Sequence, residues 1–164
     1  IRRPPRSTPS NSSAASDVYK RQFINEYFLM HPGVKAFIEK LKEDTRATEI
    51  SRTIMGRLRH IPDINSPQQR IRAAAENMAV NTPIQGSASD IIKTSMVKID
   101  KKFCELKLKS RMILQIHDEL IFEVPQEELH EAQKAIKEAM ANAVKLSVPL
   151  VVKISKGKNW LEAE

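Results

Sequence analysis

The residues best placed to do chemistry are His117, Asp118 and Glu119, a polar triplet between two apolar runs. Residues 111–116 read RMILQI and residues 120–124 read LIFEV, which is typical of half-buried strands, so the triplet is predicted to lie at the bend of a β-hairpin. A tight turn would place Asp118 at the tip, open to solvent and to a cation. Because Mg²⁺ prefers a few carboxylates together with water and phosphate oxygens, Asp118 is a candidate metal ligand. Glu119 points differently in an extended backbone, which predicts a supporting role for it.

The hexapeptide QIHDEL, residues 115–120, has a second interpretation. Two-metal phosphoryl transfer needs carboxylates from at least two chain segments, and aspartate is common in ordinary turns. A polar turn without a metal is therefore the alternative. In either case, strand alternation predicts that Met112, Leu114 and Ile116 share one face of the hairpin.

A second candidate segment is residues 72–93, RAAAENMAVNTPIQGSASDIIK. Asn81 and Gln85 flank Pro83, near the expected junction of two helices. Their amides could donate to the purine N3 and pyrimidine O2 acceptors in the minor groove of a nucleic acid. Alternatively, the two amides cap free backbone groups at a helix kink. The alanines of this segment would allow a neighbouring element to approach closely.

Helices and a small antiparallel sheet are expected to position these residues. Apolar periodicity predicts helices at 23–28 and 34–41, separated by the sequence HPG at 31–33. A further helix is predicted from Ser66, as N-cap, to about residue 80; Pro83 then interrupts it before another helix over 84–103. The remaining expectations are a short strand within 49–55, a helix over 126–144 and a last strand at 149–155. This mixture predicts an α+β fold, a small antiparallel sheet packed with long helices.

Composition excludes few functions. The 164 residues suggest one domain or a large piece of one, and no apolar run approaches the roughly 18 residues of a membrane span. Cys104 is the only cysteine, so no internal disulfide can form, and the four histidines lack metal-ligand spacing. The net charge is +7, but residues 1–22 contribute +4 of it, so global charge is weak evidence for nucleic-acid binding.

The N-terminal segment, residues 1–22, is rich in serine, proline and arginine and has few apolar residues. Such a composition predicts disorder. A basic nucleic-acid-binding arm and a solvated tail are two interpretations. The preferred one is that the segment is not native, because it resembles a translated sequencing-adapter read-through, which would leave the true chain truncated upstream.

The two candidate segments and the C-terminal stretch VPLVVKISKGKNWLEAE (148–164) together resemble the C-terminal end of bacterial family A DNA polymerases. QIHDELIFEVP (115–125) is similar to the family's third sequence block, in which an aspartate at a hairpin tip binds catalytic metal. The resemblance covers residues 23–164 in order. The chain departs from the family where Asn77 and Leu58 replace the usual arginines.

The resemblance implies the C-terminal part of a right-hand polymerase fold, with 23–66 as the end of the fingers and 67–164 as palm. The implied activity is template-dependent nucleotidyl transfer from dNTPs to a primer 3′ end by a two-Mg²⁺ mechanism. Asp118 and Glu119 would be metal carboxylates and His117 would lie beside the primer terminus. The implied DNA contacts are made to the minor groove by Asn81 and Gln85, and to a phosphate by Arg72.

The other ligands of the metal site would lie upstream, so the fragment alone is expected to be inactive. The expected partners are a DNA primer-template and a dNTP, and no membrane. The implied protein is a monomer in the bacterial cytoplasm, associated with the nucleoid. The alternative function is a non-catalytic nucleic-acid-binding or structural module with a palm-like shape.

Overall fold

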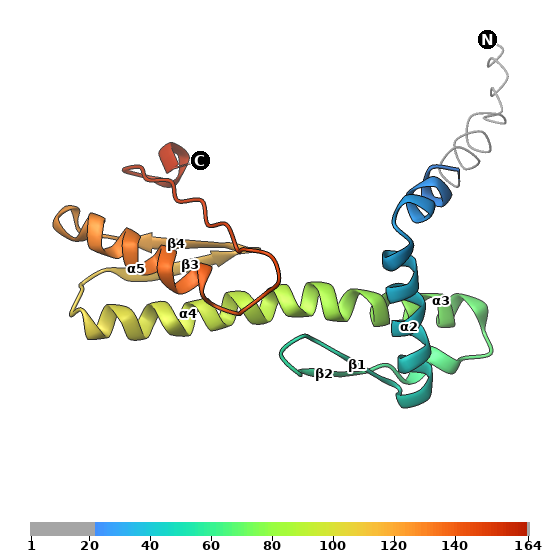
Figure 1. Cartoon of the computed structure of the whole chain (residues 1–164). Helices are drawn as coiled ribbons and strands as arrows, with labels where there is room; N and C mark the ends of the chain where they lie inside the picture. Colours follow the sequence, from blue (N-terminus) through green and yellow to red (C-terminus); the bar gives the residue numbers. More distant parts are fainter. Residues whose placement is uncertain (1–21, 164) are drawn as a thin grey trace, which may run out of the picture. The chain divides into compact units, whose positions relative to one another are not determined.

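The computed structural model describes residues 22–163 (Figure 1). The predicted tail falls almost entirely outside these residues, and residues 22–30 are helical. The described chain is helix-rich with two small antiparallel sheets, which confirms the predicted α+β class. It divides into two compact units. The first runs to Ile50 and resumes over His60–Val80, and the second comprises Ser51–Arg59 and the chain from Asn81 onward.

The first unit is built from the helices α2 (Pro32–Thr48) and α3 (Gln69–Asn81), with a short 3₁₀ helix, η1 (Pro62–Asn65), between them. His31 is the N-cap of α2 and Pro32 opens the helix, as the sequence HPG predicts. The core of the unit is small and fully buried, and consists of Ile61, Ile64, Ala75 and Ala79.

The predicted start of α3 at Ser66 is wrong. The Ser66 hydroxyl accepts a hydrogen bond of 3.3 Å from the Gln68 N–H, in the turn that precedes the helix, and α3 itself begins at Gln69. The Ser66 hydroxyl therefore stabilises the turn before α3 and does not cap the first turn of the helix. The predicted strand within 49–55 is present but short, as β1 (Ile50–Arg52), and it pairs with β2 (Leu58–His60), which was not predicted.

The predicted interruption at residues 81–83 is also wrong. Helical backbone continues from α3 through a π-helical turn, η2 (Thr82–Gly86), into α4 (Ser87–Glu105). Proline lacks an N–H, and inside an α-helix its ring clashes with the carbonyl four residues earlier. A π-helical turn shifts the local hydrogen-bond pattern, so the helix absorbs Pro83 without ending.

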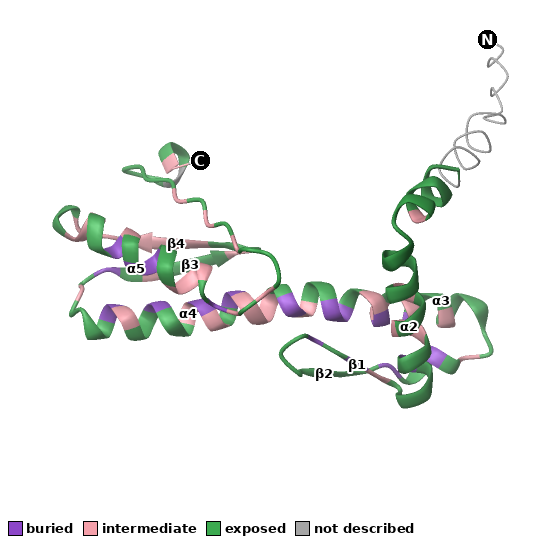
Figure 2. Cartoon of the chain, viewed as in Figure 1, coloured by how far each residue is buried: buried purple, intermediate pink, exposed green. Residues whose placement is uncertain are grey.

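The second unit packs α4 against α5 (Leu129–Ala141), with the hairpin of β3 (Arg111–Ile116) and β4 (Glu119–Glu123) completing one core. Buried positions recur along α4 among exposed ones (Figure 2). Phe103 of α4 meets Phe122 of β4 edge-on, with 5.9 Å between ring centroids. The helix predicted over 126–144 begins as a 3₁₀ turn, η3 (Gln126–Glu128), and ends at Ala141.

The strand predicted at 149–155 is wrong, because the structure assigns no regular element to this stretch, and a 3₁₀ helix, η4 (Trp160–Ala163), follows it. Val151 is 90% exposed. Valine and isoleucine favour extended backbone, but a strand forms only where a neighbouring edge completes its hydrogen bonds. Among the residues described, no helix has the length and apolarity needed to cross a membrane.

Candidate metal and nucleic-acid site

The β3–β4 hairpin ends in a two-residue loop. Ile116 pairs with Glu119, so His117 and Asp118 alone make the turn, and both are exposed. The prediction that Asp118 lies at the tip of a hairpin is confirmed; its metal role stays a prediction. Glu119 begins β4 next to it.

His117 adopts a left-handed backbone conformation, with φ of +51°. Two-residue hairpin loops favour such φ values because they match the twist of the strands, and glycine, asparagine or aspartate usually occupy them. The Gln115 side-chain amide donates to the His117 carbonyl oxygen at 3.1 Å and supports the turn. A residue other than glycine or asparagine in this region costs roughly 1–2 kcal/mol, so the surrounding hairpin must hold the loop in shape.

A β-bulge changes which side chains share a face of the hairpin. Met112 pairs with Phe122 and Leu114 with Ile121, so Ile113 is an extra residue on β3. Met112 consequently packs on the core, whereas the alternation beyond the bulge turns Leu114 away from it. The prediction that Met112 shares a face with Leu114 and Ile116 is therefore wrong.

The carboxylates of the loop fit part of a magnesium site. Asp118 and Glu119 are adjacent, exposed and oxygen-bearing, which suits a hard cation that keeps water and phosphate oxygens among its ligands. Within residues 22–163, no group of three or more His, Cys, Asp or Glu side chains is arranged to hold a metal ion. The hairpin thus offers two carboxylates toward such a site.

The amides of Asn81 and Gln85 stand on the continuous helical stretch around η2. Asn81 ends α3 and Gln85 lies within the π-helical turn, and both side chains are exposed. The Asn81 side chain makes no capping hydrogen bond, and in the described chain no intramolecular partner is found for the Gln85 amide. Both amides are exposed, and their contact with a nucleic acid stays a prediction.

Arg72 lies on α3, in the first compact unit. It is half-buried, and its Nη1 donates to the Ser66 carbonyl oxygen at 2.9 Å. The pKa of nearby Glu76 is held below its ordinary value, chiefly by the hydrogen bond from Arg46, with a smaller contribution from the charge of Arg72. Arg72 therefore already stabilises the start of α3, and a phosphate contact would use its remaining donors.

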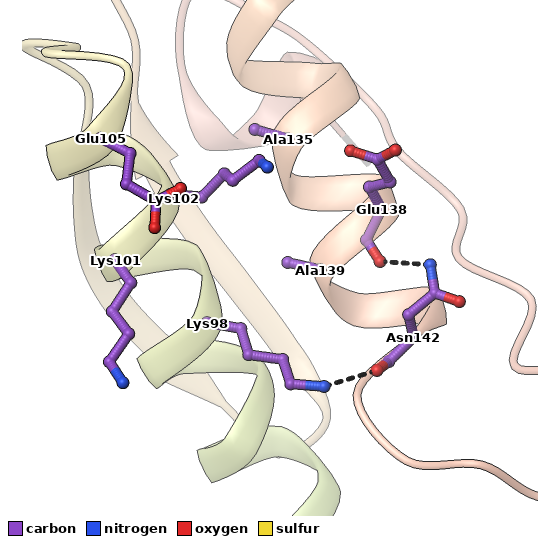
Figure 3. A pocket seen from close by; sticks show the side chains of 8 residues that line it. All are labelled: Lys98, Lys101, Lys102, Glu105, Ala135, Glu138, Ala139 and Asn142. Atoms are coloured by element: carbon purple, nitrogen blue, oxygen red, sulfur yellow. Dashed lines mark hydrogen bonds between the residues drawn. The ribbon is translucent and has the colours of Figure 1, made fainter.

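A pocket of about 430 Å³ lies between α4 and α5 and contains none of the predicted site residues (Figure 3). Lys98 extends across it to the end of α5, where its Nζ donates to the Asn142 carbonyl oxygen at 2.6 Å. The lining combines basic and acidic side chains with two alanines and an asparagine. Lys98 has a structural role there, because it links α4 to the end of α5. The pocket is lined by Lys98, Lys101, Lys102, Glu105, Ala135, Glu138, Ala139 and Asn142.

Comparison with known proteins identifies the family of the chain. The model of the family described as DNA polymerase family A matches residues 11–162, nearly the whole chain. The chain belongs to DNA polymerase family A. The match begins within the segment 1–22 that we predict to be non-native, and that assignment stays a prediction.

Individual relatives within the family are DNA polymerase I proteins. The chain is 42% identical over 144 residues to DNA polymerase I of Lactococcus lactis subsp. cremoris, covering 88% of the chain and 16% of the relative. It is 44% identical over 143 residues to that of Caldicellulosiruptor bescii, covering 87% and 17%. These matches confirm the resemblance seen in the sequence. The chain spans less than a fifth of the length of either relative.

A solved structure supports the fold. The chain resembles the POL domain of Pol1 from M. smegmatis, in complex with DNA primer-template and dNTP, with a TM-score of 0.83 and 39% identity. The likeness covers 85% of the chain and 25% of that domain. The expected fold, part of a polymerase domain, is thereby confirmed.

Proposed function

We propose that this chain supplies part of the active site and of the DNA-contact surface of a DNA-directed DNA polymerase. The reaction is template-dependent transfer of a nucleotide from a dNTP to a primer 3′ end. The observation that carries the proposal is the hairpin loop, which presents Asp118 and the adjacent Glu119 at an exposed tip in a chain of family A. The M. smegmatis domain that it resembles was solved with both a primer-template and a dNTP.

In this proposal, Asp118 and Glu119 hold Mg²⁺, with Asp118 as direct ligand and Glu119 in support. When bound, the metal polarises the phosphoryl group and stabilises the negative charge of the transition state. The two-residue loop presents Asp118, and the first residue of β4 presents Glu119 beside it; the Ile116–Glu119 pair closes the loop and holds the two carboxylates adjacent. His117 is placed beside the primer terminus.

The DNA contacts in the proposal use two kinds of donor. Asn81 and Gln85 donate from their exposed amides to minor-groove acceptors, which every correct base pair presents in similar positions. Arg72 contacts a phosphate. Residues 23–66 finish the fingers and 67–164 form palm, and the protein acts as a monomer at the bacterial nucleoid.

We also propose that the 164-residue chain alone does not extend primers. A two-metal reaction needs carboxylates from a further chain segment, and the hairpin contributes only one adjacent pair. Template-dependent extension by the purified chain, with Mg²⁺ and all four dNTPs, would contradict this.

The test of the proposed function uses a complete polymerase, made by placing this chain in the matching segment of the M. smegmatis domain. Asp118→Asn is expected to reduce turnover by about three decades or more, because metal stabilisation of charge is worth several kcal/mol and roughly 1.4 kcal/mol is tenfold. DNA affinity should change much less. Asp100→Asn, an exposed carboxylate on α4, is the matched control and should retain turnover.

A loss of less than about tenfold for Asp118→Asn would show that Asp118 is an ordinary turn residue. The chain would then be better described as a non-catalytic, nucleic-acid-binding or structural palm-like module.

A further inference from the structure

A short loop, Thr53–Arg57, is bound to the π-helical turn that carries Gln85. Arg57 makes the strongest link: its Nη2 donates to the Gly86 carbonyl oxygen at 2.9 Å and also lies 2.9 Å from Asp90 Oδ1. Gly86 directly follows Gln85, and Asp90 lies one helical turn further along α4. Arg57 therefore clamps the backbone beside Gln85 from outside the helix.

The Asp90 carboxylate depends on this clamp. Its side chain is only 12% exposed, and within the described residues Oδ2 has no hydrogen-bond partner. A buried charge that loses its ion-pair partner is strongly unfavourable. The pair consequently holds Arg57 in one position.

The loop itself is closed by its own hydrogen bonds. The Thr53 N–H donates to the Arg57 carbonyl oxygen at 3.0 Å, and the Arg57 N–H donates to the Thr53 hydroxyl at 3.1 Å. Gly56, with φ of +85°, provides the left-handed residue that this tight turn requires. The backbone that carries the Arg57 guanidinium is therefore held in place by hydrogen bonds within the loop.

Ser87 provides a second link between loop and turn. Its buried hydroxyl accepts a hydrogen bond of 2.9 Å from the Ile54 N–H and donates to the Pro83 carbonyl oxygen. A π-helical turn rearranges the regular backbone bonds, so a side chain that binds one of its carbonyls helps to fix its shape. Gln85 lies between the two anchored residues, Pro83 and Gly86.

Close packing forms the third link. A Cβ at Gly86 would lie 2.8 Å from Cγ2 of Thr53, which is itself buried. Gly86 has helical dihedrals, with φ of −63°, so its backbone conformation does not require glycine. The lack of a side chain is needed because the loop approaches the turn so closely.

We propose that the Thr53–Arg57 loop is a positioning element for Gln85, with Arg57 and Ser87 as the positioning residues. It fixes the π-helical turn so that the exposed Gln85 amide meets the minor-groove acceptor of the primer-terminal pair in one orientation. The inference rests on the proposed function, in which Gln85 makes that contact. Preorganisation of this kind matters because a small misplacement of a contacting group can cost much of its effect on rate.

The experiment measures, in the complete polymerase, the ratio of extension rates for matched and mismatched primer termini. Gln85→Ala is expected to lower this ratio by about tenfold, because a mismatch has already lost the contact. Arg57→Ala should lower the ratio to a similar extent, and the double variant should be no worse than Gln85→Ala alone. Arg52→Ala, an exposed arginine at the end of β1 next to the loop, is the matched control and should leave the ratio unchanged.

A second pair of variants tests the same positioning role but leaves the Arg57–Asp90 ion pair in place. Gly86→Ala should lower the same ratio by pressing the loop away from the turn. Adding Thr53→Ser removes the obstructing methyl group but keeps the hydroxyl that accepts from Arg57, so the combination should restore the ratio. Restoration by a further substitution distinguishes positioning from a general loss of folding.

The outcomes separate the two proposals. If Gln85→Ala leaves the ratio unchanged, the assignment of Gln85 and the inference built on it are both overturned. If Gln85→Ala lowers the ratio but Arg57→Ala slows matched and mismatched termini equally, the positioning inference alone is overturned. The same holds if Arg57→Ala and Gln85→Ala add, or if Thr53→Ser fails to rescue Gly86→Ala.

Discussion

Lys98 of α4 donates a hydrogen bond of 2.6 Å to the carbonyl oxygen of Asn142, the C-cap residue of α5 (Figure 3). The same ammonium group donates to the Ala143 carbonyl oxygen at 3.0 Å. The last carbonyls of a helix have no partner within it, and they carry the negative end of the helix dipole. A cation supplied by the neighbouring helix therefore caps α5 and ties it to α4.

Lys98→Met should destabilise the second unit by about 1 kcal/mol, because it removes two charge-assisted hydrogen bonds while keeping an apolar side chain of similar length. Thermal or urea unfolding measures the change. Lys101→Met, at an exposed position on the same helix and in the same pocket, is the control. Equal effects of the two substitutions would indicate that Lys98 acts only through the general charge of α4.

The stability of the β3 end of the hairpin should fall at acidic pH through Glu128. Its carboxylate accepts hydrogen bonds from the Lys109 N–H at 2.8 Å and from the Ser110 N–H and hydroxyl at 2.9 and 2.7 Å. These bonds, that of Lys109 most of all, hold the pKa of Glu128 below the ordinary 4.5. The contribution is therefore complete above pH 4.5 and is lost as the pH falls through the lowered pKa.

Glu128→Gln should remove this acid-dependent part of the unfolding curve, because the amide does not titrate. Unfolding monitored between roughly pH 3 and pH 7 tests the prediction, because this range spans the ordinary glutamate pKa. Glu127→Gln, at the exposed neighbouring position, should keep the acid dependence of the parent chain. If Glu128→Gln does so as well, the carboxylate does not stabilise the hairpin through its charge.

The left-handed conformation of His117 predicts that substitutions at this position differ in how much they destabilise the hairpin. His117→Val should destabilise the hairpin by roughly 1–2 kcal/mol, because a β-branched side chain is strongly disfavoured at positive φ. His117→Asn should be tolerated, since asparagine readily adopts this conformation. Hydrogen exchange of the β3 and β4 amides measures local stability. Indistinguishable protection in the two variants would argue that the loop is not held in this conformation.

For Gln85, removing the acceptor should reproduce the removal of the donor. In the complete polymerase, a primer that ends in a 3-deazapurine lacks the minor-groove nitrogen, and its extension should be slowed about as much as by Gln85→Ala, by roughly tenfold. Because both changes delete one hydrogen bond, combining them should cause little further loss. Additive losses would show that the Gln85 amide does not contact this acceptor.

Several features of this protein follow from the sequence alone because their causes are local. Pro32 after His31 specifies where α2 begins, and two strand-like runs around a polar triplet specify a hairpin with Asp118 at its tip. Capping, turn and periodicity signals act over a few residues, so they can be recognised in a linear chain. The family resemblance is likewise carried by short blocks in a preserved order, and the family match confirms it.

Other features depend on the tertiary structure. Pro83 signals a helix break, yet η2 carries the helix past it, with the Ser87 hydroxyl bound to the Pro83 carbonyl. Valine and isoleucine at 149–155 signal a strand, but no strand within the described residues pairs with this stretch.

Long-range packing determines two further features of the structure. The bulge at Ile113 places Met112 on the core and turns Leu114 away, because strand register is set by the partner strand and the helices beneath it. The clamp between Arg57 and Gly86 joins residues 29 positions apart. No local pattern encodes such a pair, since Arg57 meets Gly86 and the largely buried Asp90 carboxylate only once the loop has folded onto the helix.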